Sequence, residues 1–224
     1  MEFDRPVEVK VWGDYACFTR PEMKVERVSY PVMTPSAARG VLEAIFWKPE
    51  FTWSVREIAV LEPIAYFSIL RNEVNSRASE RAARGWADKG GGFFASDDRA
   101  QRNTLALRDV AYVIRADVVL KSPGPGLEAK YRDQFRRRVA RGQCFAQPYL
   151  GTREFTASFA EPSDADQPQP LTMGLGRMLH DLRYLPDGSG AAEPMFFDAR
   201  LENGVLRVPA MLTASSSSAE AARS

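Results

Sequence analysis

The sequence predicts an α+β protein in which strands and helices follow one another along a chain of 224 residues. Three observations support this fold class: an opening segment with strand periodicity, two helical segments with well-marked ends, and a central run of β-branched and aromatic residues. The hydrophobic content of 45% is enough for a substantial core at this length. One compact domain or two small ones is therefore expected.

The first elements are predicted to be a strand and a helix. Apolar and polar residues alternate over 7–12, and the Gly-Asp pair at 13–14 is expected to end this strand. The Thr-Pro pair at 34–35 indicates a helix start, because threonine can cap the helix and proline at the first helical position loses only an N–H without a partner. The helix is expected to run to about Phe46.

The middle of the chain is predicted to contain three strands, a long insertion and a second helix. Strands are expected over 51–61 and 64–70, and the strongest strand pattern covers 109–120. Residues 72–102 are polar and charged, which indicates an insertion or mobile loop. A Pro/Gly-rich break then precedes a helix over 127–141.

The last third of the chain is predicted to be mainly β-structure. A short strand is expected over 155–159, followed by a polar linker over 163–169. Asn203-Gly204 indicates a hairpin, because this pair supplies the positive φ angles of a two-residue turn.

The order of these elements matches a ferredoxin-like (RRM-like) βαββαβ core. We therefore predict a ferredoxin-like domain over 1–160 with 72–102 as its insertion, a small β-sheet domain over 161–211 and a disordered tail over 212–224. RNA recognition is one common use of this core, although a fold alone does not establish function.

Charge is unevenly distributed along the chain. The net charge is only +1, which taken whole argues against a nucleic-acid-binding protein. Within 121–153, however, there are eight basic residues and only two acidic ones. This segment fits a phosphate-binding surface and an ordinary solvated helix face equally well on charge alone.

Other classes of protein find little support. Two cysteines, Cys17 and Cys144, are too few for a disulfide framework; both are expected to be buried apolar residues in a protein of the reducing cytoplasm. No apolar run approaches the length of a membrane span, so no membrane partner is expected. His, Cys and carboxylate residues show no metal-ligand spacing, and neither a metal nor another cofactor is predicted. The sole histidine, His180, is expected to be structural.

Several segments together resemble one protein family. They are 12–19 with 29–32, 34–40 with 45–49, 101–105 with 108–112, 174–179 and 196–201. Their joint order and spacing is similar to the subtype I-C CRISPR repeat-processing endoribonuclease, a RAMP protein and the d variant of the fifth Cas family. The likeness spans nearly the whole chain.

The resemblance implies a metal-independent endoribonuclease. Such proteins bind the repeat hairpin of precursor CRISPR RNA and cut at its 3′ base. The ribose 2′-OH attacks the adjacent phosphate, which leaves a 2′,3′-cyclic phosphate and a 5′-OH. Proximity supplies much of the acceleration, but the protein must still move protons and neutralise charge on the phosphate. The product is then kept by its 5′ handle, so repeat RNA and other subunits of a Cascade-type complex are the expected partners.

The resemblance also suggests catalytic positions. The family uses a Tyr, Lys and His trio, and the corresponding positions here are Phe46, Lys130 and Tyr131. We expect Lys130 to neutralise phosphate charge and Tyr131 to act as a weaker general base. Phe46 cannot transfer a proton and is expected to line the site beside a base or ribose. Slow cleavage is therefore predicted.

Basic residues near both helices are predicted to bind RNA. Guanidinium groups suit phosphate because their planar fork meets two oxygens at once. Trp47 is expected to belong to the core. The predicted RNA-binding residues are Arg20, Lys24, Arg27, Arg39, Lys48, Arg136, Arg137, Arg138, Arg141 and Arg153.

Two alternatives stay open. The departures at Phe46 and Tyr131 also fit a catalytically weak or inactive RNA-binding subunit of the same complex. The arginine-rich helix fits duplex binding as well, which makes double-stranded DNA a further candidate partner.

Overall fold

The computed structural model describes residues 6–23, 25–76, 79–92, 94–122, 124–184 and 190–210. The elements in chain order are β1 (Val7–Ala16), β2 (Arg27–Val28), α1 (Pro35–Ile45), β3 (Phe51–Val60), β4 (Ala65–Val74), α2 (Glu80–Lys89), β5 (Arg99–Leu120), α3 (Leu127–Ala140), β6 (Ser158–Ala160), β7 (Met173–Tyr184), β8 (Ala192–Glu202) and β9 (Val205–Arg207). Within these ranges no helix is long and apolar enough to cross a membrane.

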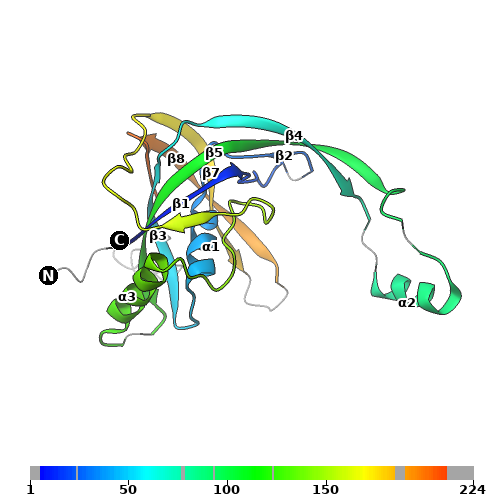
Figure 1. Ribbon diagram of the computed structural model, residues 1–224, viewed down its shortest axis with the longest axis horizontal. Helices are drawn as coiled ribbons and strands as arrows, with labels where there is room; N and C mark the ends of the chain where they lie inside the picture. Colours follow the sequence, from blue (N-terminus) through cyan, green and yellow to red (C-terminus); the bar gives the residue numbers. More distant parts are fainter. Residues whose placement is uncertain are drawn as a thin grey trace, which may run out of the picture.

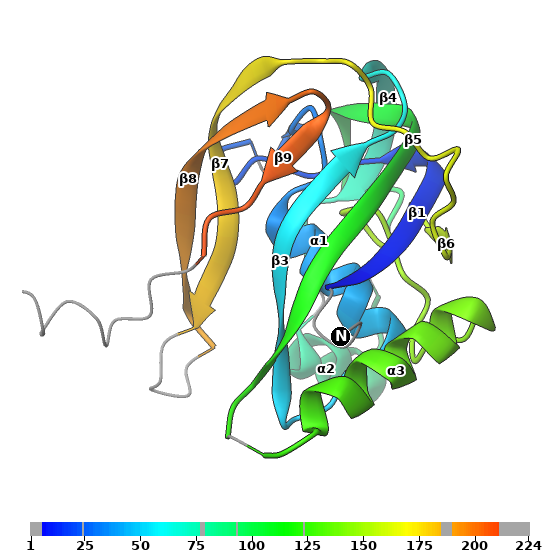
Figure 2. The ribbon, with the colours of Figure 1, turned by 90° about the vertical axis from the view of Figure 1, so that its left-hand side faces the viewer.

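One curled sheet organises the molecule (Figures 1 and 2). Its strands lie in the order β6-β1-β5-β3-β9-β8-β7, and neighbours on this path are antiparallel. The predicted α+β class is confirmed as a mixed structure with a curled antiparallel sheet and few helices. α1 and α3 share one hydrophobic core with β1, β3 and β5, so both helices cover the same face of the sheet.

Strand β1 is longer than the sequence predicts. The expectation that 13–14 ends this strand is wrong, because β1 continues to Ala16 and Gly13 pairs with Val110 of β5. A Cβ atom at Gly13 would lie 2.8 Å from Leu150 Cδ1 and 2.9 Å from the Thr156 carbonyl oxygen. Glycine is therefore present for close packing against the segment that precedes β6, a contact that no local pattern reveals.

Helix α1 forms where the sequence predicts it. The Thr34 hydroxyl accepts a hydrogen bond from the Ala37 N–H at 3.3 Å, and Pro35 occupies the first turn. The buried face repeats at three- and four-residue intervals, as a core-facing helix requires. It consists of Pro35, Ala38, Val41, Leu42 and Ile45.

The segment 72–102 forms a projecting arm (Figure 1). Of the two predicted alternatives, an insertion or a mobile loop, the regular structure fits an insertion: β4 extends to Val74, α2 follows, and β5 begins at Arg99. β4 and the first half of β5 pair with each other, and the arm carries α2 at its tip. Because α2 buries none of its residues, this part of the chain lacks the apolar periodicity that predicts a core element.

The C-terminal strands continue the same sheet. β9 pairs with β3, and β8 and β7 follow it outward. The predicted hairpin at Asn203-Gly204 is confirmed, with φ angles of 49° and 76°. The sheet curls, as Figure 2 shows, and α1 contacts both β3 and β7.

Candidate nucleic-acid interface

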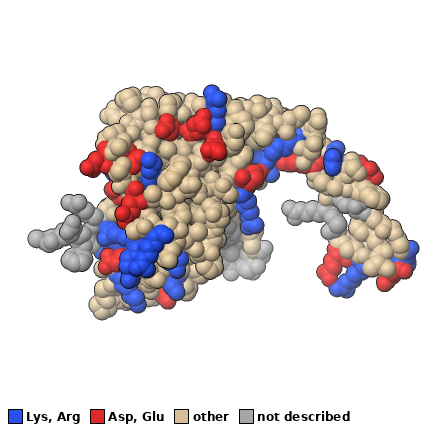
Figure 3. Space-filling view, in the orientation of Figure 1, with Lys and Arg blue, Asp and Glu red and all other residues tan. Residues whose placement is uncertain are grey.

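Helix α3 separates an apolar face from a basic one. The predicted helix over 127–141 is confirmed as Leu127–Ala140. Tyr131, Phe135 and Val139 are buried at intervals of four residues, which anchors the helix on the sheet. The opposite face carries most of the basic residues and meets solvent, and Figure 3 shows a dense cluster of blue surface over α3.

Six predicted functional cations have no carboxylate partner among the described residues. Ion pairing would otherwise satisfy such groups and reduce their attraction for phosphate. In the part of the chain that the structure describes, no Asp or Glu lies within salt-bridge distance of these side chains. They are Lys48, Lys130, Arg137, Arg138, Arg141 and Arg153.

Lys130 lies on this basic face. It is exposed, and a shallow open depression on α3 is lined by Lys130, Asp133, Arg136 and Arg137. Arg136 lies 3.7 Å from the Asp133 carboxylate, and the Arg137 Nε donates to the Asp133 carbonyl at 3.4 Å. Lys130 and the arginine row therefore share one surface, as a phosphate-binding role requires.

Phe46 and Tyr131 lie in the core instead. Phe46 is 1% exposed and Tyr131 is 7% exposed. The Tyr131 ring packs against Phe51 and Phe46, with centroid distances of 5.0 and 6.2 Å. Phe46 presents almost no surface on which a base or ribose could pack, so its burial does not favour the predicted site-lining role. The structure brings Phe46 and Tyr131 together, but not with the ammonium of Lys130 in one open cleft.

Arg138 connects the two helices that frame this surface. Its guanidinium donates to the Ile45 carbonyl at 3.0 Å and lies 5.3 Å from the centre of the Phe46 ring. A cation at a helix C-terminus offsets the negative end of the helix dipole. Arg138 thus stabilises the last turn of α1 while its charge adds to the basic surface.

Arg39 has a structural role that the sequence did not indicate. Its Nε and Nη2 donate to the two Asp181 carboxylate oxygens at 2.9 and 2.7 Å, and Nη1 donates to Glu43 at 2.7 Å. Burial alone would lower the pKa of Arg39, but the hydrogen bonds and charges of Asp181 and Glu43 raise it above its ordinary value. The predicted RNA-binding role does not fit a guanidinium that is committed to joining α1 to β7.

Of the remaining predicted cations, two lie near the base of the arm and one is outside the described residues. Arg20 lies 4.5 Å from the centre of the Tyr30 ring and 3.7 Å from Glu22. Arg27 lies 3.5 Å from Glu73 of β4. Lys24 lies outside the described residues. Arg20 and Arg27 are therefore apart from the α3 surface and already have acidic neighbours.

Two exposed aromatic side chains lie close in sequence to the basic residues. Trp47, expected in the core, is 50% exposed at the end of α1. Phe145, which sequence reasoning left without a role, is 82% exposed. Its one local signal is that 141–153 contains two arginines and no acidic residue.

Neither the cysteines nor the histidine adds a reactive centre. Cys17 is buried, as predicted, and burial raises the pKa of its thiol despite an opposing hydrogen bond with Thr19. Cys144 is half-buried. The His180 Nε2 lies 2.8 Å from the Pro209 carbonyl oxygen. Among the described residues, no group of three His, Cys, Asp or Glu side chains could hold a metal ion.

Comparison with known proteins places the chain in one family. The family model described as CRISPR-associated protein (Cas_Cas5) matches residues 7–209. A Thermus thermophilus relative named CRISPR pre-crRNA endoribonuclease Cas5d is 48% identical over 219 residues, with 91% of each chain covered. A Mannheimia succiniciproducens relative of the same name is 46% identical over 217 residues, covering 91% of this chain and 94% of its own.

Solved structures agree on the fold. One described as a CRISPR-associated protein superposes with a TM-score of 0.63 at 24% identity, covering 94% of this chain and 95% of its own. The family model and the two relatives each extend over most of the sequence. The chain therefore belongs to the Cas5d family of CRISPR-associated proteins.

Proposed function

We propose that this chain binds the repeat hairpin of precursor CRISPR RNA on the α3 surface and cleaves it at the 3′ base of the hairpin. The observation that carries the proposal is the set of six basic side chains named above, which have no carboxylate partner among the described residues, in a chain 46–48% identical to two proteins named as CRISPR pre-crRNA endoribonucleases. Lys130, which lies within that surface, is the proposed catalytic residue.

The proposed reaction needs no metal because the RNA supplies its own nucleophile. The 2′-oxygen forms a bond to the adjacent phosphorus, and the bond from phosphorus to the 5′-oxygen breaks. The 2′-OH proton is lost and the leaving 5′-oxygen gains one, so the products are a 2′,3′-cyclic phosphate and a 5′-OH. Lys130 counters the negative charge that develops on the phosphate, and Arg137 and Arg141 hold neighbouring phosphates.

Tyr131 remains the proposed general base, under a structural condition. Its ring is largely buried beside Phe51, and only 7% of the residue is exposed to solvent. Proton transfer therefore requires the scissile ribose to reach a phenol that is mostly covered by the core. A poorly placed base costs part of the roughly 10²–10⁴-fold that proton transfer contributes, which supports slow cleavage.

The architecture supports a ferredoxin-like domain over 1–160. The sequence of elements β1-α1-β3-β5-α3-β6 is βαββαβ, with the arm as an insertion, and these strands lie in the order β6-β1-β5-β3. The proposed second domain over 161–211 contributes β7, β8 and β9 as a continuation of that sheet. The proposed tail over 212–224 lies outside the described residues.

A binding subunit without catalysis is the second candidate. The burial of Tyr131 favours it, because a residue that is 7% exposed is poorly accessible for proton transfer, and Phe46 has no group that could replace it. In both proposals the chain keeps the 5′ handle of the RNA and joins other subunits of an interference complex.

Binding of double-stranded DNA by α3 would use the same cations. A competition between duplex DNA and repeat RNA at fixed salt distinguishes it from RNA binding.

The decisive experiment uses the RNA's own hydroxyl. Purified protein is incubated in EDTA with its cognate repeat RNA and with the same RNA carrying one 2′-deoxy nucleotide 5′ to the scissile phosphate. We expect a single cut with a 2′,3′-cyclic phosphate in the first RNA, and intact but equally well bound RNA in the second. Binding of both RNAs without cleavage would support the binding subunit, and cleavage of the deoxy RNA at the same bond would refute the proposed nucleophile.

A further inference from the structure

The segment that follows α3 is fixed on the end of α1. The Ala44 carbonyl accepts hydrogen bonds from the backbone N–H groups of Phe145 and Ala146, at 2.8 and 3.0 Å. Further along, the Cys17 N–H donates to the Leu150 carbonyl at 3.0 Å. The backbone at Phe145 is therefore held between two core elements.

The Phe145 side chain nevertheless points into solvent. At 82% exposure it is the most exposed large hydrophobic side chain in the part of the chain that the structure describes. Leu150, on the same segment, is fully buried. The segment thus anchors itself with Leu150 and holds an aromatic ring outward, where the ring adds little to folding.

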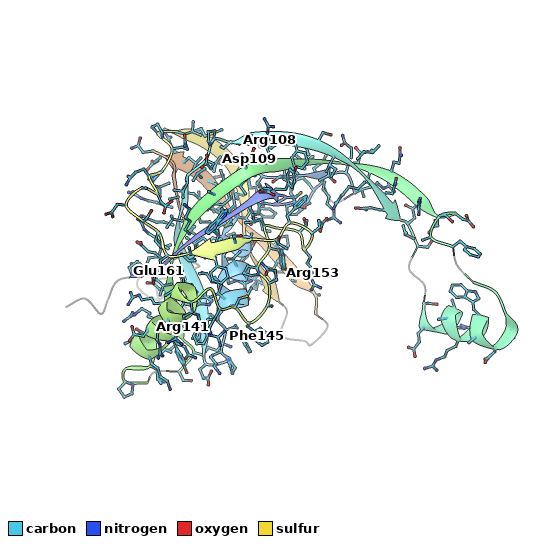
Figure 4. All side chains as sticks on the ribbon, in the orientation of Figure 1. Arg108, Asp109, Arg141, Phe145, Arg153 and Glu161 are labelled. Carbon is cyan, nitrogen blue, oxygen red and sulfur yellow. The ribbon has the colours of Figure 1, made fainter. Side chains whose placement is uncertain are left out.

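The segment that carries this ring has an arginine at each end. These are Arg141 and Arg153, and neither has a carboxylate partner among the described residues. In the view of Figure 4, Phe145 lies between Arg141 and Arg153. An exposed ring with flanking guanidinium groups suits single-stranded RNA, since bases stack on aromatic rings and phosphates bind arginine. Bases inside a hairpin stem are already stacked on one another and cannot use such a ring.

We propose that Phe145 stacks on an unpaired base of the repeat RNA next to the hairpin, with Arg141 and Arg153 binding the adjacent phosphates. This rests on the proposed function and specifies which part of the RNA lies at the end of α1. The stem occupies the α3 surface, and the single-stranded flank passes over the 141–153 segment. A flank of repeat RNA is thereby recognised by base stacking in addition to charge.

The test compares Phe145→Ala, Phe145→Leu and Phe145→Trp with the wild type. Phe94→Ala serves as the matched control, since Phe94 is 73% exposed and belongs to the arm. Each protein is titrated with cognate repeat RNA that includes its flanks and with the hairpin alone. Thermal unfolding checks that each variant folds as the wild type does.

We expect Phe145→Ala to raise the Kd for flanked RNA about 5- to 150-fold, the cost of losing one base stack. Phe145→Trp should bind within about 3-fold of the wild type, Phe145→Leu should not rescue, and Phe94→Ala should change nothing. The Kd for the hairpin alone should be unaffected. A 2-aminopurine at the stacked flank position should be quenched by the wild type and not by Phe145→Ala.

Unchanged binding of flanked RNA by Phe145→Ala would overturn the proposal, as would full rescue by leucine. Loss of assembly with other subunits at unchanged RNA affinity would assign the ring to a protein contact and overturn it too. These outcomes are separate from failure of the proposed function. If the proposed function fails, the wild type will neither bind nor cut repeat RNA. If the wild type cuts the RNA and Phe145→Ala binds flanked RNA with the same Kd, only the stacking proposal is refuted.

Discussion

At the scale of single residues, chemical type is a poor guide to whether an arginine is free to bind RNA. Arg39 and Arg141 are the same amino acid, one in the middle of α1 and one at the end of α3. Arg39 is held by Asp181 and Glu43, whereas Arg141 has no carboxylate partner among the described residues. The neighbours, of which Asp181 is distant in sequence and Glu43 is four residues away, decide which of the two guanidinium groups is free to bind a phosphate.

Arg39 should therefore matter for stability and not for RNA affinity. Replacing it with alanine leaves the buried Asp181 carboxylate without its partner, and we expect a loss of about 2–3 kcal/mol in unfolding free energy. Urea denaturation measures the loss, and the double variant Arg39→Met with Asp181→Leu should recover much of it. A normally stable Arg39→Ala protein with weakened RNA binding would contradict this assignment.

At the scale of elements, α3 has one face that anchors it in the core and another that exposes basic side chains to solvent. Its apolar residues at 131, 135 and 139 fix the helix on the sheet, so the cations between them are presented on a rigid surface. The arm is the opposite arrangement, because α2 buries none of its residues. We assign the proposed RNA-binding surface to α3 for this reason.

The salt dependence of RNA binding should show how many phosphates α3 contacts. Arg137→Ala combined with Arg141→Ala should weaken RNA binding and reduce the magnitude of the slope of log K against log salt by about 1.5. The reason is that binding of the double variant neutralises fewer phosphates and so releases fewer counterions from the RNA. The control is Arg183→Ala with Arg200→Ala, which removes the same charge from β7 and β8. Equal slopes for both double variants would show that overall charge, and not α3, determines binding.

At the scale of the whole molecule, local signals predict elements and non-local contacts limit the prediction. α1 could be predicted because its cap and its apolar spacing lie within the helix itself. The continuation of β1 past Gly13 could not, since it depends on the distant segment around Leu150. The arm was missed because strands paired outside a core need no apolar face.

The candidate site likewise has features that local sequence predicts and features that depend on distant contacts. The run of arginines in α3 is visible in the sequence, and the structure places it on one surface with Lys130. The burial of Phe46 and Tyr131 is not visible, because matching a family position gives a residue its place in the chain and not its environment. The exposure of Trp47 and Phe145 was likewise beyond prediction, since aromatic residues are more often buried.

The most direct test of the account is the effect of Lys130→Ala on cleavage and binding measured separately. Single-turnover cleavage of cognate repeat RNA in EDTA gives the rate, and titration with RNA carrying the 2′-deoxy nucleotide gives the Kd. We predict a rate about 10²-fold or more below the wild type with a Kd changed by less than about 5-fold, while Arg200→Ala leaves both unchanged. A Lys130→Ala protein that cuts at the wild-type rate would contradict the claim that this lysine counters the charge on the scissile phosphate.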